Sequence, residues 1–179
     1  MKKYHRQTEP SCLTKNSKKW NERWSKKVKI NNNSTWNWNE YKKQPVNKLL
    51  ESALLAGSGN KCAFCGVKLT KENSQLLEIE HFRPKKDFPN FAFTWTNLYP
   101  SCHCCNFHKN AQFSEDLIPP DYQEFEENWL EISETSLIVS SHCPEKYRIG
   151  LNKTINYYRL EMKDWYREKI IPNFYNYAK

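Results

Sequence analysis

Two pairs of closely spaced cysteines constrain this 179-residue chain more than any other feature of its sequence. Cys62 and Cys65 form one C-x2-C pair, Cys102 and Cys105 form the second, and 36 residues separate the pairs. Each pair bends the chain so that two thiolates face one point, and two such knuckles complete the tetrahedral sulfur shell that zinc accepts in closed structural sites. The spacing therefore predicts one structural zinc ion, which stabilises folding because the unfolded chain cannot preassemble its ligands.

Alternative ligands lie beside the second pair. Cys104 could replace Cys105 in a C-x-C arrangement, and His103 and His108 are close in sequence. We prefer Cys105 because it preserves the two-residue spacer of the first pair. Four buried free thiols, or a redox C-x2-C pair, are the competing interpretation, and two matched pairs favour zinc over both. The remaining cysteines have no partner at ligand spacing and are expected to be packing residues: Cys12 and Cys143.

The apolar content of the chain predicts a cytoplasmic location with no membrane contact. No apolar stretch follows the positively charged N-terminus, MKKYHRQTEP, so a secretory signal is not expected. The longest apolar run, Ala53 to Ala56, is too short to cross a bilayer. In a reducing compartment stable disulfides are disfavoured, so clustered cysteines indicate metal binding or catalysis.

The formal net charge of +8 is concentrated at one end of the chain. Residues 1–44 hold 12 Lys or Arg against 3 Asp or Glu, whereas residues 115–134 hold eight acidic side chains and no basic one. A basic segment suits a protein that binds a polyanion, because contacts to phosphate release counterions, although a solvated tail is the commoner explanation of a charge run. Four tryptophans are too many for a free tail, so we expect the basic segment to dock on another surface: Trp20, Trp24, Trp36 and Trp38.

The spacing of apolar residues and the positions of helix breakers predict an α+β fold. In chain order the expected elements are a short helix over 18–29, a helix from Pro45 to Gly57, a strand over Leu76–Phe82, an irregular loop over 83–101, a short helix over Cys104–Asn110, a β-hairpin over Trp129–Ser141 and a C-terminal helix over Asn152–Lys169. We expect three parts: a basic, tryptophan-rich arm (1–44), a zinc-centred core with its preceding helix (45–115), and an acidic segment followed by the hairpin and the last helix (116–179).

Residues that could carry chemistry lie between the two cysteine pairs and directly after the second. The string EIEHFRPKK contains Glu80, His81 and Arg83, and Asn106 follows Cys105. A single histidine is more often structural and a single glutamate more often a surface acid, but their grouping between metal-binding cysteines favours a site. Imidazole has the pKa range needed to deprotonate water near neutral pH, and carboxylate and amide oxygens suit Mg2+ or Mn2+ better than a second zinc.

The pattern C-x2-C … E-H-x2-P … N … C-x2-C-N-x2-K resembles the HNH (ββα-metal) nucleases in their four-cysteine form, over about Lys61 to Asn110. The strings IEHFRPK and W-x-N-L-x3-C-x2-C-N-x2-K, the acidic segment and the late LN helix further resemble the HNH subunit family of Septu-type anti-phage systems (PtuB), which also accompanies some retrons. The resemblance implies a ββα-metal core and hydrolysis of DNA that leaves a 5′-phosphate and a 3′-hydroxyl.

The resemblance also implies a role for each matched residue. His81 matches the general base that activates water, and Asn97 matches the middle residue of the motif, which holds the loop of the base through its backbone. Glu80 and Asn106 match the two ligands of the catalytic Mg2+ or Mn2+. Glu80 stands where Asp or His is more usual, and its longer stem leaves the metal geometry open.

Three basic side chains near the motif could hold phosphate oxygens: Arg83, Lys85 and Lys109. Arginine offers a bidentate fork for this purpose, whereas an ordinary surface cation explains Lys85 equally well. Asn110 lies four residues after Asn106 and could face the same metal. A position at the helix end, where Asn tolerates a left-handed cap, explains Asn110 better.

Three functions are compatible with these features. The first is an HNH nuclease that cuts DNA as the effector of an anti-phage system, and the second is a nuclease that cuts RNA, for example a tRNA. The third is a non-catalytic zinc module that binds nucleic acid or protein, which would not need Glu80, His81 and Asn106 together. The resemblance also implies a partner ATPase of the Septu type (PtuA), for which the tryptophan-rich and acidic segments are candidate docking surfaces.

Overall fold

The computed structural model of the chain describes residues 1, 3–69, 77–133 and 137–161. Its α-helices are α1 (Ser11–Ile30), α2 (Val46–Ser58), α3 (His103–Lys109) and α4 (Glu145–Tyr157). The strands form three antiparallel pairs: β1 (Glu40–Tyr41) with β2 (Gln44–Pro45), β3 (Leu77–His81) with β4 (Leu98–Cys102), and β5 (Leu130–Ile132) with β6 (Leu137–Val139). Helices and small antiparallel pairs confirm the α+β class.

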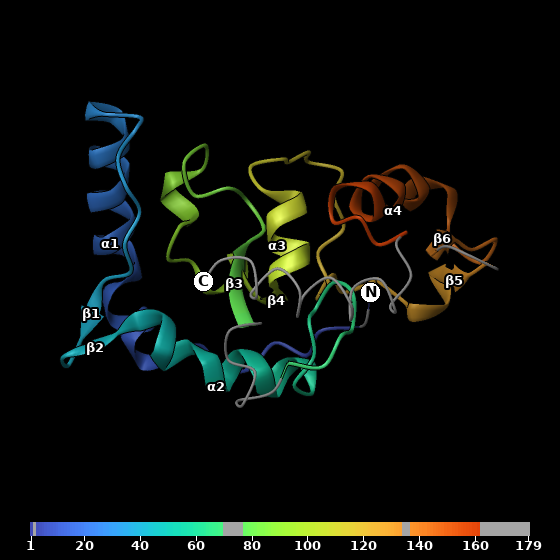
Figure 1. Cartoon of the computed structure of the whole chain (residues 1–179), viewed down its shortest axis with the longest axis horizontal. Helices are drawn as coiled ribbons and strands as arrows, with labels where there is room; N and C mark the ends of the chain where they lie inside the picture. The colour runs from blue at the N-terminus through green and yellow to red at the C-terminus, as the bar shows by residue number, and fades with distance from the viewer. Residues whose placement is uncertain (2, 70–76, 134–136, 162–179) are drawn as a thin grey trace, which may run out of the picture.

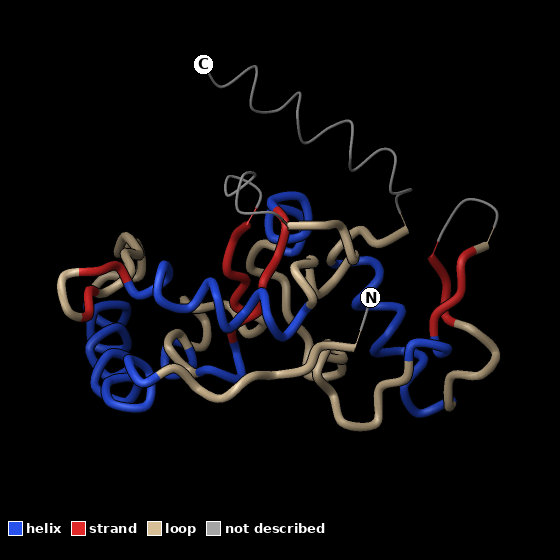
Figure 2. The backbone as a smooth tube through the Cα atoms, turned by 90° about the horizontal axis from the view of Figure 1, so that it is seen from below, coloured by secondary structure: helices blue, strands red, loops and turns tan. Residues whose placement is uncertain are grey.

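The elements are arranged along one long axis (Figure 1). α1 and the β1–β2 pair form one end, α4 and the β5–β6 pair form the other, and β3, β4 and α3 lie between them. α2 runs beneath the middle and packs against β4, and the view from below keeps the β3–β4 pair at the centre (Figure 2). The strands that carry EIEH and the second cysteine pair therefore occupy the centre of the molecule.

The basic N-terminal segment is a packed part of the fold and not an arm. α1 starts directly after Pro10 and is longer than the predicted helix over 18–29. Leu13, Trp20 and Trp24 are buried on one side of it, in a core that also contains Phe93. Its lysines lie on the exposed side, so the helix is both strongly basic and firmly packed. The surface on which the tryptophans dock belongs to this chain itself.

The position of Gly57 was assigned wrongly by the sequence pattern. α2 ends at Ser58, and the left-handed residue that caps it is Gly59, with φ +60°. Gly57 lies inside the helix, where an added Cβ would come within 2.7 Å of the His5 carbonyl oxygen. This glycine is required because the N-terminal segment crosses α2 at that point, with His5 N–H donating to the Gly57 carbonyl at 2.9 Å.

The prediction of an irregular loop over 83–101 was also wrong at its end, because Leu98–Cys102 is strand β4. Pro100 argued against a strand, since proline cannot donate to a ladder. In a two-stranded sheet each strand has a free edge, and the Pro100 carbonyl accepts a hydrogen bond at that edge from Ala63 N–H at 2.9 Å. The first cysteine knuckle thereby pairs with the strand that leads into the second.

The C-terminal part agrees with the predicted hairpin but not with the predicted helix boundaries. β5 and β6 pair in antiparallel fashion within the predicted hairpin. α4 begins at Glu145, directly after Pro144, which is earlier than the predicted Asn152, and it ends at Tyr157. Arg159 has a positive φ of 51° and stops the helix there. The predicted helical residues 162–169 lie outside the described residues.

The acidic segment over 115–133 is largely paired with basic side chains of the same chain. Its ion pairs are Glu115 with Arg83, Asp116 with Lys153, Asp121 with Arg6 and Glu124 with Lys146. The Asp121 pair is the least exposed, and its Nε–Oδ2 distance is 2.5 Å. The segment therefore ties the N-terminus, the central loop and α4 together.

Candidate active site

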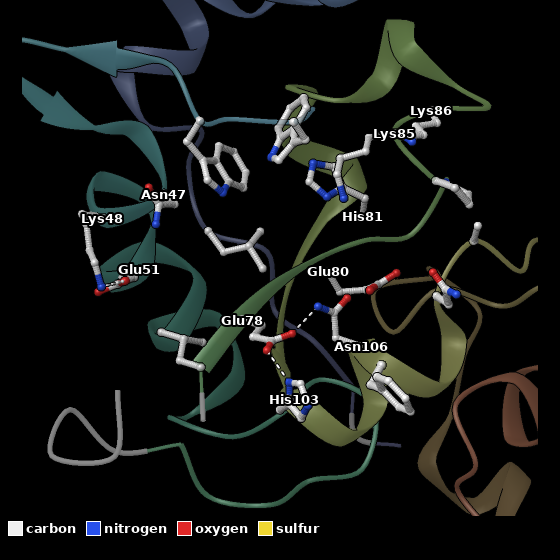
Figure 3. A pocket seen from close by; sticks show the side chains of 18 residues that line it. Asn47, Lys48, Glu51, Glu78, Glu80, His81, Lys85, Lys86, His103 and Asn106 are labelled. Carbon is white, nitrogen blue, oxygen red and sulfur yellow. Dashed lines mark hydrogen bonds and ion pairs between the residues drawn. The ribbon is translucent and has the colours of Figure 1, made fainter. Parts of the chain in front are cut away.

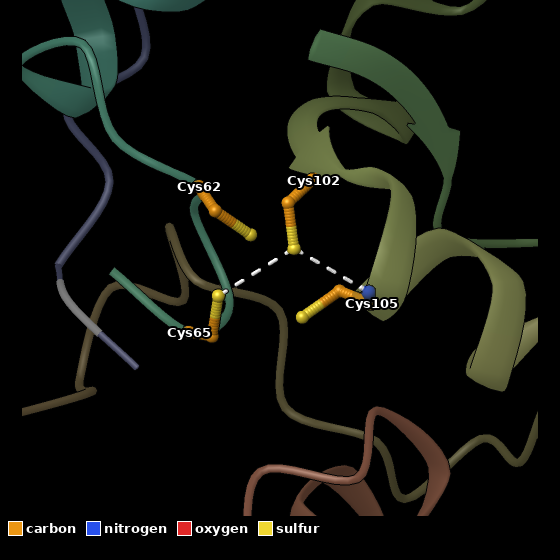
Figure 4. Close-up of side chains that lie close together, drawn as sticks. All are labelled: Cys62, Cys65, Cys102 and Cys105. Atoms are coloured by element: carbon orange, nitrogen blue, oxygen red, sulfur yellow. Dashed lines mark hydrogen bonds between the residues drawn. The ribbon is translucent and has the colours of Figure 1, made fainter. Parts of the chain in front are cut away.

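The four cysteines predicted to bind zinc converge in the structure (Figure 4). The sulfur atoms of Cys62, Cys65, Cys102 and Cys105 all lie within 4.8 Å of one another, and the Cys65 and Cys102 sulfurs are 3.6 Å apart. Four sulfurs bound to one zinc at about 2.3 Å would be about 3.8 Å apart. The cluster thus has the size and donor set of a metal site that could hold zinc.

Local backbone structure sets the directions of these thiols. The first knuckle closes with Gly66 N–H donating to the Cys62 carbonyl at 2.9 Å, and Gly66 takes a φ of +77° that favours glycine. The second pair spans the junction of β4 and α3, where the Cys102 sulfur accepts from Cys105 N–H at 3.5 Å. Both pairs therefore occupy chain reversals that turn two thiols inward.

The electrostatics of the cluster favour a bound cation. Burial raises the pKa of the Cys62 thiol. Hydrogen bonds from the Cys102, Cys105 and Cys65 thiols lower this pKa by more than burial raises it, so the pKa is well below the usual value. The pKa of Cys105 is well above the usual value because of burial and of the neighbouring thiols. The negative charge of one buried thiolate thus opposes ionisation of the neighbouring thiol. A divalent cation bound between the sulfurs would stabilise them as thiolates.

The structure also separates the alternative ligands from the cluster. Cys104 is half-buried and is not a member, so the two-residue spacer is the arrangement observed. The Nδ1 atom of His103 lies 2.6 Å from an oxygen of Glu78 on β3, away from the sulfurs. Cys12 and Cys143 are buried elsewhere in the two hydrophobic cores, as packing residues.

A cleft of about 820 Å³ lies beside β3 and α3 (Figure 3). It is lined by Glu78, Glu80 and His81 of β3, by Asn106 and neighbouring residues of α3, by Lys85 and Lys86, and by Trp36 and Trp38. Residues from widely separated parts of the sequence, between positions 36 and 111, thus line one cleft. Arg83 and Asn97 do not line it.

His81 is a buried, neutral imidazole in the wall of this cleft. The side chain is 6% exposed, and its Nε2 lies 3.0 Å from the Ala92 carbonyl oxygen. Since a carbonyl can only accept, Nε2 carries the hydrogen and Nδ1 is the basic nitrogen. Burial lowers the pKa of His81 well below its usual value, with Lys85 contributing in the same direction. The ring also stacks on Trp38 at a centroid distance of 5.5 Å.

Asn97 connects three points of the loop that follows β3. Its Oδ1 accepts from Arg83 N–H at 2.7 Å, and its Nδ2 donates to the carbonyls of Arg83 and Phe91, each at 3.0 Å. Asn97 is 4% exposed. Its amide therefore holds the backbone on both sides of the loop that carries Ala92, the hydrogen-bond partner of His81.

α1 supports the same loop from outside. Asn21 accepts from Phe93 N–H at 2.7 Å, and Trp24 Nε1–H donates to the Lys85 carbonyl at 2.6 Å. Sequence reasoning missed this function of the N-terminal segment. Asn21 and the indole N–H of Trp24 carry no pattern that would have identified it.

Glu80 forms a buried ion pair with Lys109. One Glu80 oxygen lies 2.5 Å from Lys109 Nζ, and the two side chains are 2% and 0% exposed. The Lys109 ammonium also donates to the His81 carbonyl at 2.6 Å. Burial raises the pKa of Glu80 to about 7, against the opposing effect of Lys109. Glu80 thus lines the cleft as a buried carboxyl group that has one oxygen paired with Lys109.

Glu78 is a cleft residue that sequence reasoning did not single out. It lies on the same face of β3 as Glu80, and its two oxygens contact His103 and the side-chain amide of Asn106. The E-x-E spacing in EIEH could have identified it, since alternate residues of a strand share a face. His81 lies on the opposite face of β3 from Glu78 and Glu80. It packs against Trp36 and Trp38 at the edge of the same cleft.

Two predicted phosphate contacts are used elsewhere. The Arg83 guanidinium binds both oxygens of Glu115, at 3.1 and 2.9 Å, and lies over the rings of three phenylalanines: Phe88, Phe91 and Phe113. Lys109 is fully buried. Lys85 lines the cleft, and burial lowers its pKa. Asn110 caps α3 with a φ of 47°, in agreement with its expected place at the helix end.

Replacing Lys109 with methionine is expected to destabilise the fold by about 3 kcal/mol, at the lower end of the range for breaking a buried ion pair. The loss of unfolding free energy stays at the lower end of this range because Glu80, with its pKa of about 7, can bind a proton instead of remaining charged. Urea denaturation at pH 7 measures this difference. Lys48→Met, which breaks the exposed Lys48–Glu51 pair, should cost about 1 kcal/mol or less. Equal losses in the two variants would contradict the structural importance of the buried pair.

Comparison with known proteins shows that about half of the chain is similar to two proteins named Septu protein PtuB and to a phage protein. The Septu protein PtuB of Bacillus thuringiensis is 42% identical over 92 residues, which are 50% of this chain and 32% of that protein. Protein ea31 of Escherichia phage lambda is 33% identical over 108 residues, which are 53% of this chain and 35% of ea31. The Septu protein PtuB of Bacillus mycoides strain KBAB4 is 30% identical over 103 residues, with 50% and 33% covered.

The chain spans about a third of the length of these relatives. No protein-family model matches it. Among the helices that the structure describes, none combines the length and the apolar character that a bilayer span requires.

Proposed function

We propose that this chain is a metal-dependent nuclease of the HNH type that hydrolyses phosphodiester bonds of DNA. His81 is the general base, and Glu80 and Asn106 hold one divalent cation. The proposal rests on one observation: these three side chains line a single cleft, next to a four-cysteine cluster. The order β3, β4, α3 around that cluster agrees with the ββα arrangement that the sequence resemblance implies.

His81 is suited to act as the base because its proton-accepting nitrogen is defined. Nε2–H is engaged by the Ala92 carbonyl, so Nδ1 takes a proton from water as the water oxygen attacks phosphorus. The bond from phosphorus to the 3′ oxygen breaks and the departing oxygen takes a proton from solvent water, which leaves a 5′-phosphate and a 3′-hydroxyl. Asn97 acts as a positioning residue, since it fixes the loop that carries the Ala92 carbonyl.

Oxygen ligands in the cleft fit Mg2+ or Mn2+. Glu80 offers the carboxylate oxygen that is not paired with Lys109, and Asn106 offers an amide oxygen from α3. When bound, this cation neutralises the charge that develops on the departing oxygen. Lys85 is the basic side chain placed to contact the substrate phosphate at the rim. The four cysteines hold a structural Zn2+ that keeps β4 and α3 in register with the first knuckle.

Incubation of the purified chain with plasmid DNA and with tRNA, each with and without Mg2+ or Mn2+, tests this function. We expect nicked or linear DNA only with the added cation. Cleavage of tRNA but not of plasmid DNA would show that the substrate is RNA. If neither substrate is cut at any concentration of Mg2+ or Mn2+, the cleft belongs to a non-catalytic zinc module.

The pH dependence of cation binding follows from the raised pKa of Glu80. Below its pKa of about 7 the carboxyl carries a proton in the metal-free protein, and a cation has to displace that proton. The apparent affinity for Mn2+ should therefore weaken about tenfold for each pH unit below 7 and level off above it. Calorimetric titration at pH 6, 7 and 8 measures this trend. Glu80→Gln should abolish the pH dependence together with most of the affinity, and an unchanged trend in this variant would rule out Glu80 as a ligand.

The similarity to PtuB supports a role in Septu-type anti-phage defence, with an ATPase of the PtuA type as partner. The two candidate docking surfaces differ from what their composition suggested. Trp20 and Trp24 belong to the core, Trp36 and Trp38 are half-buried against it, and much of the acidic segment is paired within the chain. Deletion of residues 1–44 would therefore unfold the protein, and co-purification of the intact chain followed by mass identification is the suitable test of a partner.

A further inference from the structure

Trp36 and Trp38 form an aromatic wall beside the proposed active site. They lie in the segment between α1 and β1, are half-buried, and line the same cleft as Glu80, His81 and Asn106. Their rings meet at a centroid distance of 5.4 Å, and both contact the His81 ring. Trp36 also packs on Trp24 and Phe93 of the adjacent core, whereas Trp38, in the ring contacts that the structure describes, meets that core only at Phe93.

The aromatic wall formed by Trp36 and Trp38 also lines a second hollow. That hollow contains Arg23 and Lys27 of α1. In the cleft, Lys85 Nζ lies 5.7 Å from the centre of the Trp36 ring. Cations therefore lie beside the wall in both hollows, and α1 carries further exposed lysines: Lys15, Lys18, Lys19, Lys26 and Lys29.

We infer that Trp36 and Trp38 are a stacking platform for an unpaired nucleobase, and that the substrate is single-stranded or looped nucleic acid. This inference rests on the proposed function and names its substrate class. Aromatic faces beside a positively charged track are the combination that binds single strands, since every base has a π face and every nucleotide a phosphate. In an intact duplex the base faces are already stacked on one another and are not available to tryptophan. Because the His81 ring stacks on one face of Trp38, a base would stack on the opposite face of Trp38, next to the cleft that contains His81.

Binding measured without added Mg2+ or Mn2+ separates recognition from cleavage. Fluorescence anisotropy at fixed ionic strength would compare a labelled 12-nucleotide single strand of DNA, the same sequence as RNA, and the DNA duplex. We expect both single strands to bind at least about tenfold more tightly than the duplex. Trp38→Leu should weaken single-strand binding about tenfold, the effect of removing one base stack, and leave duplex binding unchanged.

Two variants exclude a purely structural explanation. Trp38→Phe keeps an aromatic face and should retain most of the single-strand affinity, although Phe and Leu are similarly apolar. Tyr122→Leu removes a half-buried aromatic ring outside the cleft and should have no effect on either ligand. Equal affinity for duplex and single strand, or equal losses in the Leu and Phe variants, would overturn the inference.

The same assay distinguishes failure of this inference from failure of the proposed function. Suppose that single strands bind in a way that depends on Trp38 but are not cleaved with any divalent cation. This result would support the stacking platform and rule out the nuclease activity. Cleavage of duplex DNA at equal rates by the parent chain and Trp38→Leu would retain the nuclease and remove the platform.

Discussion

Replacing Cys62 with serine is expected to unfold the chain. Zinc binding to a four-cysteine site contributes on the order of 10–16 kcal/mol, which equals or exceeds the total stability of a typical domain of about 5–15 kcal/mol. Cys62 is completely buried, and its knuckle connects α2 to strand β4 through the Ala63–Pro100 hydrogen bond. Without the ion, two distant parts of the chain lose their common attachment, and β4 and α3 lose their connection to the first knuckle.

The measurement combines bound zinc per chain with far-ultraviolet circular dichroism and a thermal melt. Cys104→Ser is the matched control, because Cys104 is adjacent to the second pair but outside the cluster, and it should keep one zinc per chain and the parent melting curve. Exhaustive chelation of the parent protein should reproduce the unfolding seen in Cys62→Ser. A stable, zinc-free and active Cys62→Ser protein would rule out the structural metal site.

The second large effect concerns catalysis. His81→Ala is expected to reduce nucleic-acid cleavage by about a hundred- to ten-thousand-fold, the usual contribution of a general base, while zinc content stays near one per chain. The substitution also leaves a cavity beside Trp36 and Trp38. Loss of activity alone could therefore reflect a shift of these two side chains. His81→Gln addresses this possibility, because its amide can still donate to the Ala92 carbonyl but cannot accept a proton from water.

Both His81 variants should therefore be inactive, and His81→Gln should be the more stable of the two. Rates are measured on single-stranded and duplex substrates at saturating Mg2+, with His5→Ala as a control at an exposed histidine far along the sequence. Added imidazole should partly restore cleavage by His81→Ala, since it supplies the missing base. Parent-level cleavage by His81→Gln would show that His81 is not the base.

Local patterns predicted the parts of the fold that depend on neighbouring residues. The start of α2, the position of β3 and the end of α3 follow from apolar spacing and from caps, which are properties of a few adjacent residues. Strand β4 was missed because Pro100 is unfavourable in most strands, and its tolerance depends on the free edge of a two-stranded sheet. α4 begins earlier than predicted, directly after Pro144, and its first turns bury Tyr147 and Leu151.

Charge was the least reliable guide to the site. Arg83 is two residues from His81, yet its guanidinium lies among three phenylalanine rings and pairs with Glu115. Lys109 supports Glu80 from inside the protein, and four carboxylates of the acidic segment pair with basic side chains of the same chain. A side chain chooses its partner from all the groups that the fold brings near it, so a sequence lists charges without showing which are already neutralised.

By itself, the sequence determined the thiols that meet at one point and the polar residues grouped between them. Spacing alone is sufficient there, because a two-residue spacer forces paired sulfurs to one side of a turn and the chemistry of thiolates selects the metal. Only the tertiary structure decided that the N-terminal helix supports the loop behind His81, that Glu78 shares the cleft with Glu80, and that Trp36 and Trp38 form one of its walls. These relations join residues far apart in the chain, and packing of the whole molecule is what brings them into contact.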